Sequence, residues 1–398
     1  MEPNKPVRIG ITGSYGGMNM GDEAILQSII SQIRSSIKAE IVVFSRDPED
    51  TLKRHKVEKS IAIRDLSRKE SELEVMDLDI LIVGGGGILF DVDVKEYLRE
   101  AQIAHEKGIP FMVYAVGAGP LRDPESQKIV REVLDYASIV TVRDRPSRRL
   151  LEDIGVHREI VVTADPVFAL EPDESIADIL SNTGIVRGRK LIGMSVREPG
   201  RAAPDLKVEH YHEVIANAAD FMIERYGAQI VFIPMERKTL FDLHHSYAVI
   251  TKMVWPQFVS VLDAEYTPLQ IMAIMKELDF VVGMRLHFLI FAALQTIPFV
   301  PLPYSGKISG LLEELGLDMP PFENITSGRL ITFIDRAWHL REQIQKRTVE
   351  FIPGLKKRAQ QNNTILIEEL RILAARKGQD PDIMPAVLPS TPQKSKAA

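Results

Sequence analysis

Short apolar runs that end in glycine or polar residues, each followed by a helical pattern, recur along this chain. The first run covers residues 7–12, ends in the glycine-rich loop 13–21, and precedes apolar residues at helical spacing. Short strands that alternate with helices predict parallel, doubly wound sheets. We therefore predict an α/β fold with two Rossmann-like domains. The predicted strands are 7–12, 40–44, 79–83, 111–116, 138–142, 159–162, 191–196, 229–233, 258–261, 280–282 and 299–301.

The polar connection 173–190 separates two sets of strands, and 398 residues exceed what one core usually supports. Helical patterns cover 308–315, 331–345 and 355–375, and the remaining residues are rich in Pro, Ser and Lys. The predicted parts of the chain are an N-terminal domain at 1–178, a C-terminal domain at 179–354, a C-terminal helix at 355–376 and a disordered tail at 377–398.

Composition excludes several classes of protein. Cysteine is absent, which excludes disulfides and thiolate metal sites and favours a reducing compartment, so we expect a cytoplasmic protein. The formal net charge of -6 gives no general reason to expect a nucleic acid partner. The first residues lack the apolar core of a signal peptide, and Arg285, His287 and Pro298 interrupt the most apolar stretch. A soluble protein is expected, which can still contact a membrane peripherally.

Two glycine-rich segments follow strands at the edge where open parallel sheets bind ligands. The loop 13–21 does not match G-x-G-x-x-G, so it does not predict a dinucleotide site. Asn19 and Asp22 can bind sugar hydroxyls, whereas Asp22 can equally cap the following helix. The four glycines at 84–87 fit close packing against either a ligand or a facing helix.

Basic residues follow several of the predicted strands. Arg285 and His287 lie between a strand and an apolar helix, and Lys307 follows the next strand. Such a helix N-terminus attracts a phosphate or a carboxylate, and the histidine can donate a proton to the bound ligand. Arg143 and Arg197 follow other strands, where each can either clamp an anion or pair with the adjacent acid.

Metal and nucleotide motifs are weak in this sequence. The Asp-x-Asp pairs at 77–79 and 91–93 are interpreted as helix caps and solvated charges. His244 and His245 lack a third ligand at suitable spacing. The signatures of P-loop proteins, zincins and α/β-hydrolases are absent. No metal site is predicted.

Seven segments resemble, in their order and spacing, the bacterial polysaccharide pyruvyltransferases, and most closely the CsaB type that modifies secondary cell-wall polymers. The resemblance spans most of residues 7–320. The segments that carry it are 16–26, 84–91, 117–120, 141–144, 165–166, 283–287 and 305–307.

The resemblance implies a GT-B-like arrangement, with the helix at 355–376 crossing back to the first domain. It also implies that phosphoenolpyruvate donates pyruvate to a hexose as a 4,6-ketal, with release of phosphate. In the CsaB type the hexose is N-acetylmannosamine of a lipid-linked cell-wall precursor, and the ketal helps surface-layer proteins to dock. The resemblance thus makes phosphoenolpyruvate a substrate and implies no cofactor or metal. It also implies that the protein acts in the cytoplasm, at the inner face of the cell membrane.

The resemblance also implies roles for individual residues. His287 is the expected general acid, which protonates the methylene carbon of phosphoenolpyruvate. The expected donor-binding residues are Arg143, Lys307 and Arg285, and the expected acceptor-binding residues are Asn19, Asp22, Gly85 and Gly86.

Two other functions fit the same sequence. A nucleotide-sugar glycosyltransferase or epimerase of the GT-B type would bind a diphosphate at residues 285–287. A catalytically silent sugar-binding or assembly protein would not need His287. The sequence leaves open the acceptor sugar, the stereochemistry of the linkage, the base for the sugar hydroxyl and the formation of homo-oligomers.

Overall fold

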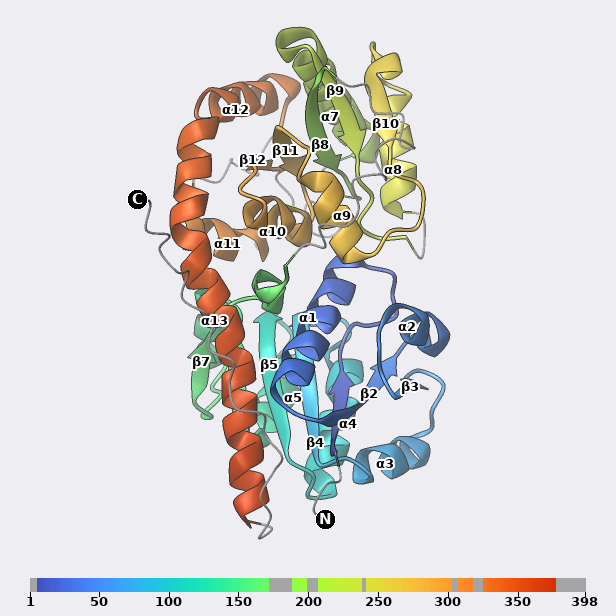
Figure 1. The fold of residues 1–398 in the computed structure, drawn as a ribbon, viewed down its shortest axis with the longest axis vertical. Helices are drawn as coiled ribbons and strands as arrows, with labels where there is room; N and C mark the ends of the chain where they lie inside the picture. The colour runs from blue at the N-terminus through green and yellow to red at the C-terminus, as the bar shows by residue number, and fades with distance from the viewer. Residues whose placement is uncertain are drawn as a thin grey trace, which may run out of the picture.

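The computed structural model describes residues 6–171, 188–198, 207–237, 241–302, 307–317 and 325–376. They form two α/β domains, each with a wholly parallel sheet (Figure 1). This confirms the predicted fold class. The boundary predicted at residue 178 and the tail predicted at 377–398 both lie outside the described residues.

The first domain holds a seven-stranded sheet in the order β3-β2-β1-β4-β5-β6-β7. The central strands are almost wholly buried because helices cover both faces. Its strands are β1 Val7–Thr12, β2 Ala39–Ser45, β3 Lys59–Ala62, β4 Ile80–Leu89, β5 Phe111–Ala118, β6 Ile139–Val142 and β7 Ile160–Val162. Its helices are α1 Met20–Ser36, α2 Pro48–Arg54, α3 Arg68–Met76, α4 Val94–Glu106, α5 Pro124–Tyr136, α6 Arg145–Asp153 and the 3-10 turn η1 Pro166–Ala169.

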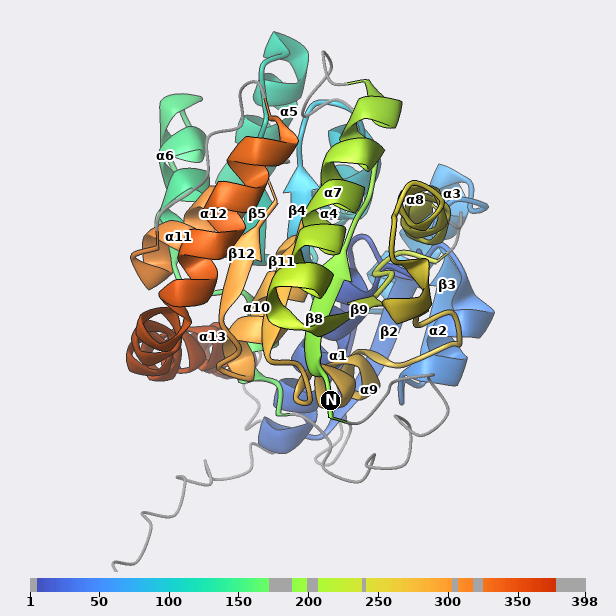
Figure 2. The same ribbon diagram turned by 90° about the horizontal axis from the view of Figure 1, so that it is seen from above.

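The second domain holds a five-stranded sheet in the order β10-β9-β8-β11-β12. Helices α7 and α12 pack side by side on one face of it (Figure 2). Its strands are β8 Lys190–Ser195, β9 Ala228–Phe232, β10 Val259–Val261, β11 Phe280–Gly283 and β12 Phe299–Pro301. Its helices are α7 Val208–Tyr226, α8 Phe241–Ile250, η4 Pro256–Phe258, α9 Pro268–Met275, α10 Leu286–Leu294, α11 Lys307–Leu315 and α12 Ser327–His339, followed by α13 Arg341–Arg376.

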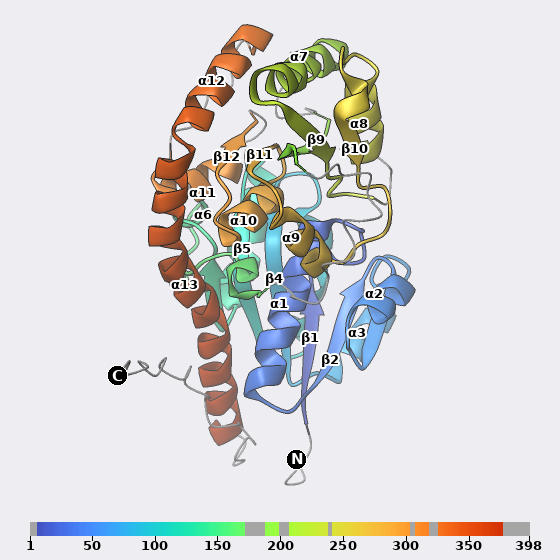
Figure 3. The same cartoon turned by 45° about the horizontal axis from the view of Figure 1, so that its top comes forward.

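Strand order reverses direction once in each sheet, between β1 and β4 and between β8 and β11. Such switch points open a crevice beyond the carboxyl ends of the strands, and ligands bind there. Helix α1 of the first domain packs against α9 and α10 of the second (Figure 3). The two crevices therefore face each other across the domain boundary.

Backbone hydrogen bonds join the domains beside this boundary. The Met20 amide donates to the Met235 carbonyl at 2.8 Å, and the Arg237 amide donates to the Met18 carbonyl at 3.2 Å. Asn19 and Glu236 form an antiparallel bridge between these two bonds. The loop before α1 is thereby fixed to the loop that follows β9.

Helix α13 runs along both domains (Figure 1) and continues through Pro353, although the sequence pattern suggested a break before residue 355. Its buried Asn362 enters the first domain. There the Thr141 and Thr163 hydroxyls donate to Asn362 Oδ1 at 2.7 and 2.8 Å, and Asn362 Nδ2 donates to the Ala164 carbonyl at 3.2 Å. One amide thus ties the C-terminal helix to the ends of β6 and β7.

Replacing this amide should destabilise the protein. In Asn362→Leu the buried Ala164 carbonyl loses the hydrogen bond from Nδ2, at a cost of about 1–3 kcal/mol. The Thr141 and Thr163 hydroxyls lose their shorter bonds to Oδ1 and keep the longer ones to the Val113 and Val142 carbonyls. We expect a lower midpoint of thermal unfolding in calorimetry. The matched control is Gln361→Leu at the exposed neighbouring position. Equal midpoints for the two variants would contradict this account of the helix.

Candidate active site

A cavity of about 420 Å³ lies where the two switch points meet. The first domain contributes the loop after β1, the start of α1 and the ends of β4 and β6. The second contributes the ends of β8 and β11 and the loop after β9. The lining residues that carry polar or charged groups are Ser14, Asn19, Asp22, Arg46, Asp93, Tyr97, Arg143, Arg197, Glu236, Arg285 and His287.

His287 is the second residue of α10 and faces the first domain. Its Nε2 atom lies 3.4 Å from Oδ2 of Asp165, and its side chain is 12% exposed. The opposite edge of the ring packs against the start of α1, because a Cβ added to Gly21 would lie 2.0 Å from Nδ1. The imidazole is therefore held between two elements of the first domain.

Arg143 immediately follows β6 and is buried beside two carboxylates. Its NH1 lies 3.3 Å from Asp165 Oδ2, and its Nε lies 3.4 Å from Asp144 Oδ2. The backbone of Gly117 lies flat against the guanidinium, where a Cβ would come within 2.7–2.8 Å of it. The sequence suggested that Arg143 either clamps an anion or pairs with the adjacent acid. Its position is compatible with both, since it pairs with Asp144 and also lines the cavity.

Asp165 connects the two basic groups through a single carboxylate oxygen. Burial raises the pKa of Asp165, but the nearby charges of His287 and Arg143 and the hydrogen bond from the Val167 amide lower it by more, so the net pKa lies below the usual value. The carboxylate is therefore ionised at neutral pH. It can orient the His287 ring from one side while it holds Arg143 in place on the other.

Asp22 lies on the cavity side of the same histidine. Burial raises its pKa above the usual value, although the charge of His287, a hydrogen bond with Ser14 and the charge of Arg46 oppose that shift. Asp22 and Asp165 thus have pKa values shifted in opposite directions around one imidazole. Such divergence is typical of sites that perform acid–base chemistry.

Arg285, the other basic residue beside α10, is already paired within the protein. Its NH2 lies 2.5 Å from Oδ1 of Asp242 and 2.6 Å from Oε2 of Glu236. Burial lowers the pKa of Arg285, but the two carboxylates raise it by more, so the net pKa is above the usual value. Asp242 also accepts the Met235 and Glu236 amides at 3.0 and 3.1 Å. Arg285 therefore braces the loop that bridges the domains, while it still lines the cavity.

The residues expected to bind the acceptor lie at different depths. Asn19 lines the cavity and caps α1, since its Oδ1 accepts the Gly21 amide at 3.0 Å. Gly85 and Gly86 belong to the extended strand β4, have positive φ angles and lie behind the cavity, against Ile25 and Asp22 respectively. Gly87 is the glycine of the run that reaches the lining.

Lys307 is the first residue of α11, and its side chain lies outside the described part of the structure. Its helix reaches the same rim. The Cβ of Asp144 lies 3.1 Å from the position that a Cβ on Gly310 would occupy. The start of α11 therefore lies beside the Arg143–Asp144 segment.

Gly21→Ala is predicted to displace the imidazole of His287. The added methyl group would overlap Nδ1, and a misplacement of about 1 Å at a reacting group can lower activity about 100-fold. The measurement is the turnover number kcat with saturating substrates. Gly328→Ala is the control, because nothing lies within 4 Å of the position of its Cβ and Gly328 does not line the cavity. Similar kcat values for both variants would contradict the proposed role of this contact.

No three His, Asp or Glu side chains in the described ranges come together as a metal site. None of the described helices is both long and apolar enough to span a membrane.

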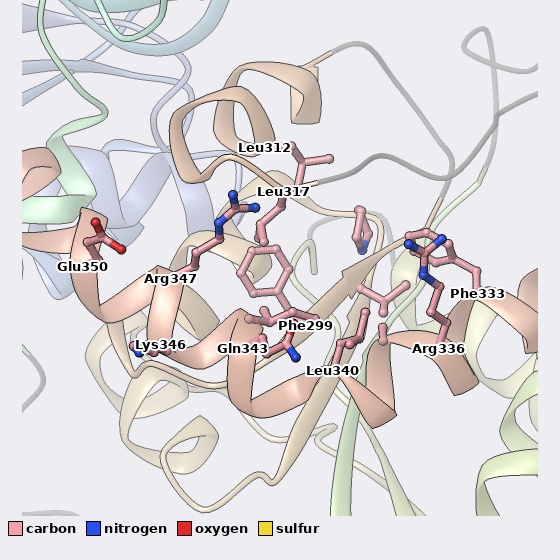
Figure 4. A pocket seen from close by; sticks show the side chains of 14 residues that line it. Phe299, Leu312, Leu317, Phe333, Arg336, Leu340, Gln343, Lys346, Arg347 and Glu350 are labelled. Carbon is pink, nitrogen blue, oxygen red and sulfur yellow. The ribbon is translucent and has the colours of Figure 1, made fainter.

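Another cavity, of about 510 Å³, lies between β12, α11, α12 and α13 and shares no lining residue with the active-site cavity (Figure 4). Its floor is apolar, with Phe299, Leu312 and Leu340.

Two α/β domains that face each other through the carboxyl ends of parallel sheets define the GT-B class of fold. The structure is similar to UDP-GlcNAc 2-epimerase from Neisseria meningitidis, with a TM-score of 0.61 and 13% identity over 91% of this chain and 99% of the other. It is also similar to a glycosyltransferase from Rickettsia africae, with a TM-score of 0.59 and 10% identity over 93% and 99% of the two chains. These similarities confirm the predicted GT-B-like arrangement.

The chain belongs to the polysaccharide pyruvyl transferase family, whose model matches residues 19–306. It is similar to the amylovoran biosynthesis protein AmsJ of Erwinia amylovora, with 21% identity over 288 residues and 69% of each chain covered. The protein is therefore a transferase of the class that pyruvylates polysaccharides. The matched range contains Asn19, Asp22, Arg143, Asp165 and His287.

Proposed function

We propose that the protein transfers pyruvate from phosphoenolpyruvate to a hexose as a 4,6-ketal and releases phosphate. The observation that carries the proposal is the contact series Arg143–Asp165–His287, which joins a buried cation to a histidine across the domain boundary. Phosphoenolpyruvate has three negative charges and one carbon that must be protonated. The site offers groups for both requirements.

In the proposed reaction Arg143 and Lys307 hold the phosphate and carboxylate of the donor, because a small trianion needs several cations. His287 gives one proton to the methylene carbon, which becomes a methyl group. The adjacent carbon becomes cationic and bonds to the first sugar hydroxyl. Asp165 keeps the imidazole oriented during this step.

Asp22 is proposed to accept the hydrogen bond of that first hydroxyl and then its proton, since its raised pKa makes it a better base than an ordinary carboxylate. Phosphate then leaves as the C–O bond to the donor breaks. The second hydroxyl bonds to the same carbon, and its proton leaves with phosphate. The net change converts one enol phosphate and two hydroxyls into one ketal and inorganic phosphate.

The acceptor that we propose is N-acetylmannosamine of a lipid-linked secondary cell-wall polymer precursor, as in the CsaB type. Asn19 and Asp22 line the cavity on the first domain and support a hydroxyl-binding role there. The reaction then takes place at the inner face of the cell membrane, and its product takes part in anchoring surface-layer proteins.

The nucleotide-sugar alternative places a diphosphate beside Arg285. The two carboxylates that already pair with this guanidinium disfavour a further anion at that position. This observation favours pyruvyl transfer over a nucleotide-dependent reaction.

The proposal is tested by measuring phosphate release from phosphoenolpyruvate with a panel of acceptors. The panel holds a lipid-diphosphate N-acetylmannosaminyl disaccharide, galactose- and glucose-terminated analogues, and a sample without acceptor. Phosphate release that requires one of the sugars supports the proposal. Consumption of UDP-N-acetylglucosamine without any use of phosphoenolpyruvate would replace it with the nucleotide-sugar alternative.

A further inference from the structure

A second cavity adjoins the active site on the first domain. Its volume is about 530 Å³, and it lies over the loops after β1, β2 and β3 and along the first turns of α4. Arg46, Asp93 and Tyr97 line both this cavity and the active-site cavity. The two cavities are therefore neighbours that share one wall.

The shared wall combines an aromatic ring with hydrogen-bonding groups. The Arg46 guanidinium lies 5.7 Å from the centre of the Tyr97 ring and donates to Ser14 Oγ at 3.1 Å. It also donates to the Tyr97 hydroxyl. The ring of Phe90, which lines the active-site cavity, lies 6.1 Å from the Tyr97 ring. Aromatic faces beside polar groups suit a sugar ring, which has apolar C–H faces and a rim of hydroxyls.

The remaining lining contains charges of both signs. Arg64 and Glu96 form a pair at 3.7 Å with side chains that are 58% and 66% exposed. Asp93 is the N-cap residue of α4, but its side chain makes no capping hydrogen bond. Arg99 is already held by Glu100 and by the Ile63 carbonyl. The three guanidinium groups of the lining, on Arg46, Arg64 and Arg99, each already have a partner within the protein, and Asp93 and Glu96 add two carboxylates. Such a mixture of paired donors and acceptors favours hydroxyl groups over a phosphate.

We propose that this second cavity, bounded by Arg64, Asp93 and Glu96, binds the sugar residue next to the hexose that accepts pyruvate. This inference rests on the proposed function and extends it from one hexose to a chain of at least two sugar residues. The shared wall then separates the reacting sugar from its neighbour. The neighbouring sugar is then bound by residues of the first domain only, since the lining of the second cavity belongs to that domain.

The test compares kcat/KM for the accepting hexose as a methyl glycoside with kcat/KM for a disaccharide that ends in the same hexose. The wild-type protein should prefer the disaccharide. Arg64→Ala and Glu96→Gln, whose side chains line only the second cavity, should each lower the disaccharide-to-monosaccharide ratio by about tenfold. Lys95→Ala is the control, since Lys95 is an exposed neighbour on α4 that pairs with Glu125. It should leave the ratio at the wild-type value.

Three results would overturn the inference: a wild-type protein without preference for the disaccharide, a ratio that neither variant changes, or a ratio that Lys95→Ala lowers equally. A third acceptor, the same hexose on a diphosphate, tests a phosphate-binding role. If Arg64→Ala weakens turnover of this acceptor alone, the cavity binds phosphate and the sugar assignment is wrong.

Failure of the proposed function gives a different result, namely no product with any acceptor. In that case titration calorimetry without phosphoenolpyruvate tests the second cavity by itself. It compares the affinity of the free disaccharide for the wild-type protein with its affinity for Arg64→Ala. Affinity about tenfold weaker in the variant supports the sugar site. Equal affinities or an absence of binding overturn it.

Discussion

His287→Ala is expected to lower kcat for acceptor-dependent phosphate release by about 10²- to 10⁴-fold, the usual contribution of a positioned general acid. The imidazole reaches the cavity from the first turn of α10, and Asp165 and Gly21 fix its orientation. Alanine removes the proton donor but keeps the helix. The measurement is steady-state turnover with saturating phosphoenolpyruvate and acceptor, together with the midpoint of thermal unfolding.

The control for this variant is His210→Ala at an exposed position on α7, which should retain wild-type turnover. A His287→Ala protein that folds normally and keeps more than about a tenth of the wild-type kcat would contradict the role as acid. It would agree with a sugar-binding protein that has no catalytic need for this residue.

Arg143→Gln is expected to lower kcat/KM for phosphoenolpyruvate by about 10- to 100-fold, mainly through a higher KM. Each hydrogen bond to a charged group contributes about 1.5–3 kcal/mol, and the buried guanidinium is positioned to make such bonds to the donor. The substitution also leaves Asp165 and Asp144 without their cation, so some loss of thermal stability will accompany it. Steady-state kinetics with varied phosphoenolpyruvate measure the effect.

The matched control is Arg148→Gln on α6, where the arginine is 49% exposed and pairs with Glu152. Its kinetic constants should equal those of the wild-type protein. If Arg143→Gln lowers the unfolding midpoint but leaves KM for phosphoenolpyruvate unchanged, the arginine supports the structure and does not bind the donor.

Local sequence patterns predicted the sheets well because parallel strands buried on both faces are continuous apolar runs. The same patterns placed element boundaries wrongly at a run of glycines and at a proline, because each residue type can either end an element or lie inside one. Residues 84–87 extend β4 and are not a loop, since a bulge beside Gly86 lets the glycine run stay paired with β5. Helix α13 passes through Pro353 and joins the end of the predicted segment 331–345 to the predicted segment 355–375, because its contacts with both domains stabilise one long helix.

The candidate site was predictable where its residues follow the carboxyl ends of strands, as Arg143 does directly after β6 and His287 does four residues after the end of β11. Asp165 appeared in the sequence only as part of a segment of family resemblance, since nothing local shows that its carboxylate reaches His287, 122 residues away. That contact depends on how the domains meet. Arg285 likewise pairs with residues far from it in sequence, since Glu236 and Asp242 lie 49 and 43 residues earlier within the same domain. Pairing between distant residues is a property of the fold and not of spacing.

The most direct test of pyruvyl transfer uses phosphoenolpyruvate labelled with ¹³C at its central carbon. After incubation with the lipid-diphosphate N-acetylmannosaminyl disaccharide, the product is analysed by mass spectrometry and carbon NMR. We predict that the label becomes a ketal carbon bonded to two oxygens of the hexose, and that the His287→Ala protein does not form this product. Label that stays in phosphoenolpyruvate or in free pyruvate, with an acceptor of unchanged mass across the whole panel, would contradict the proposed reaction.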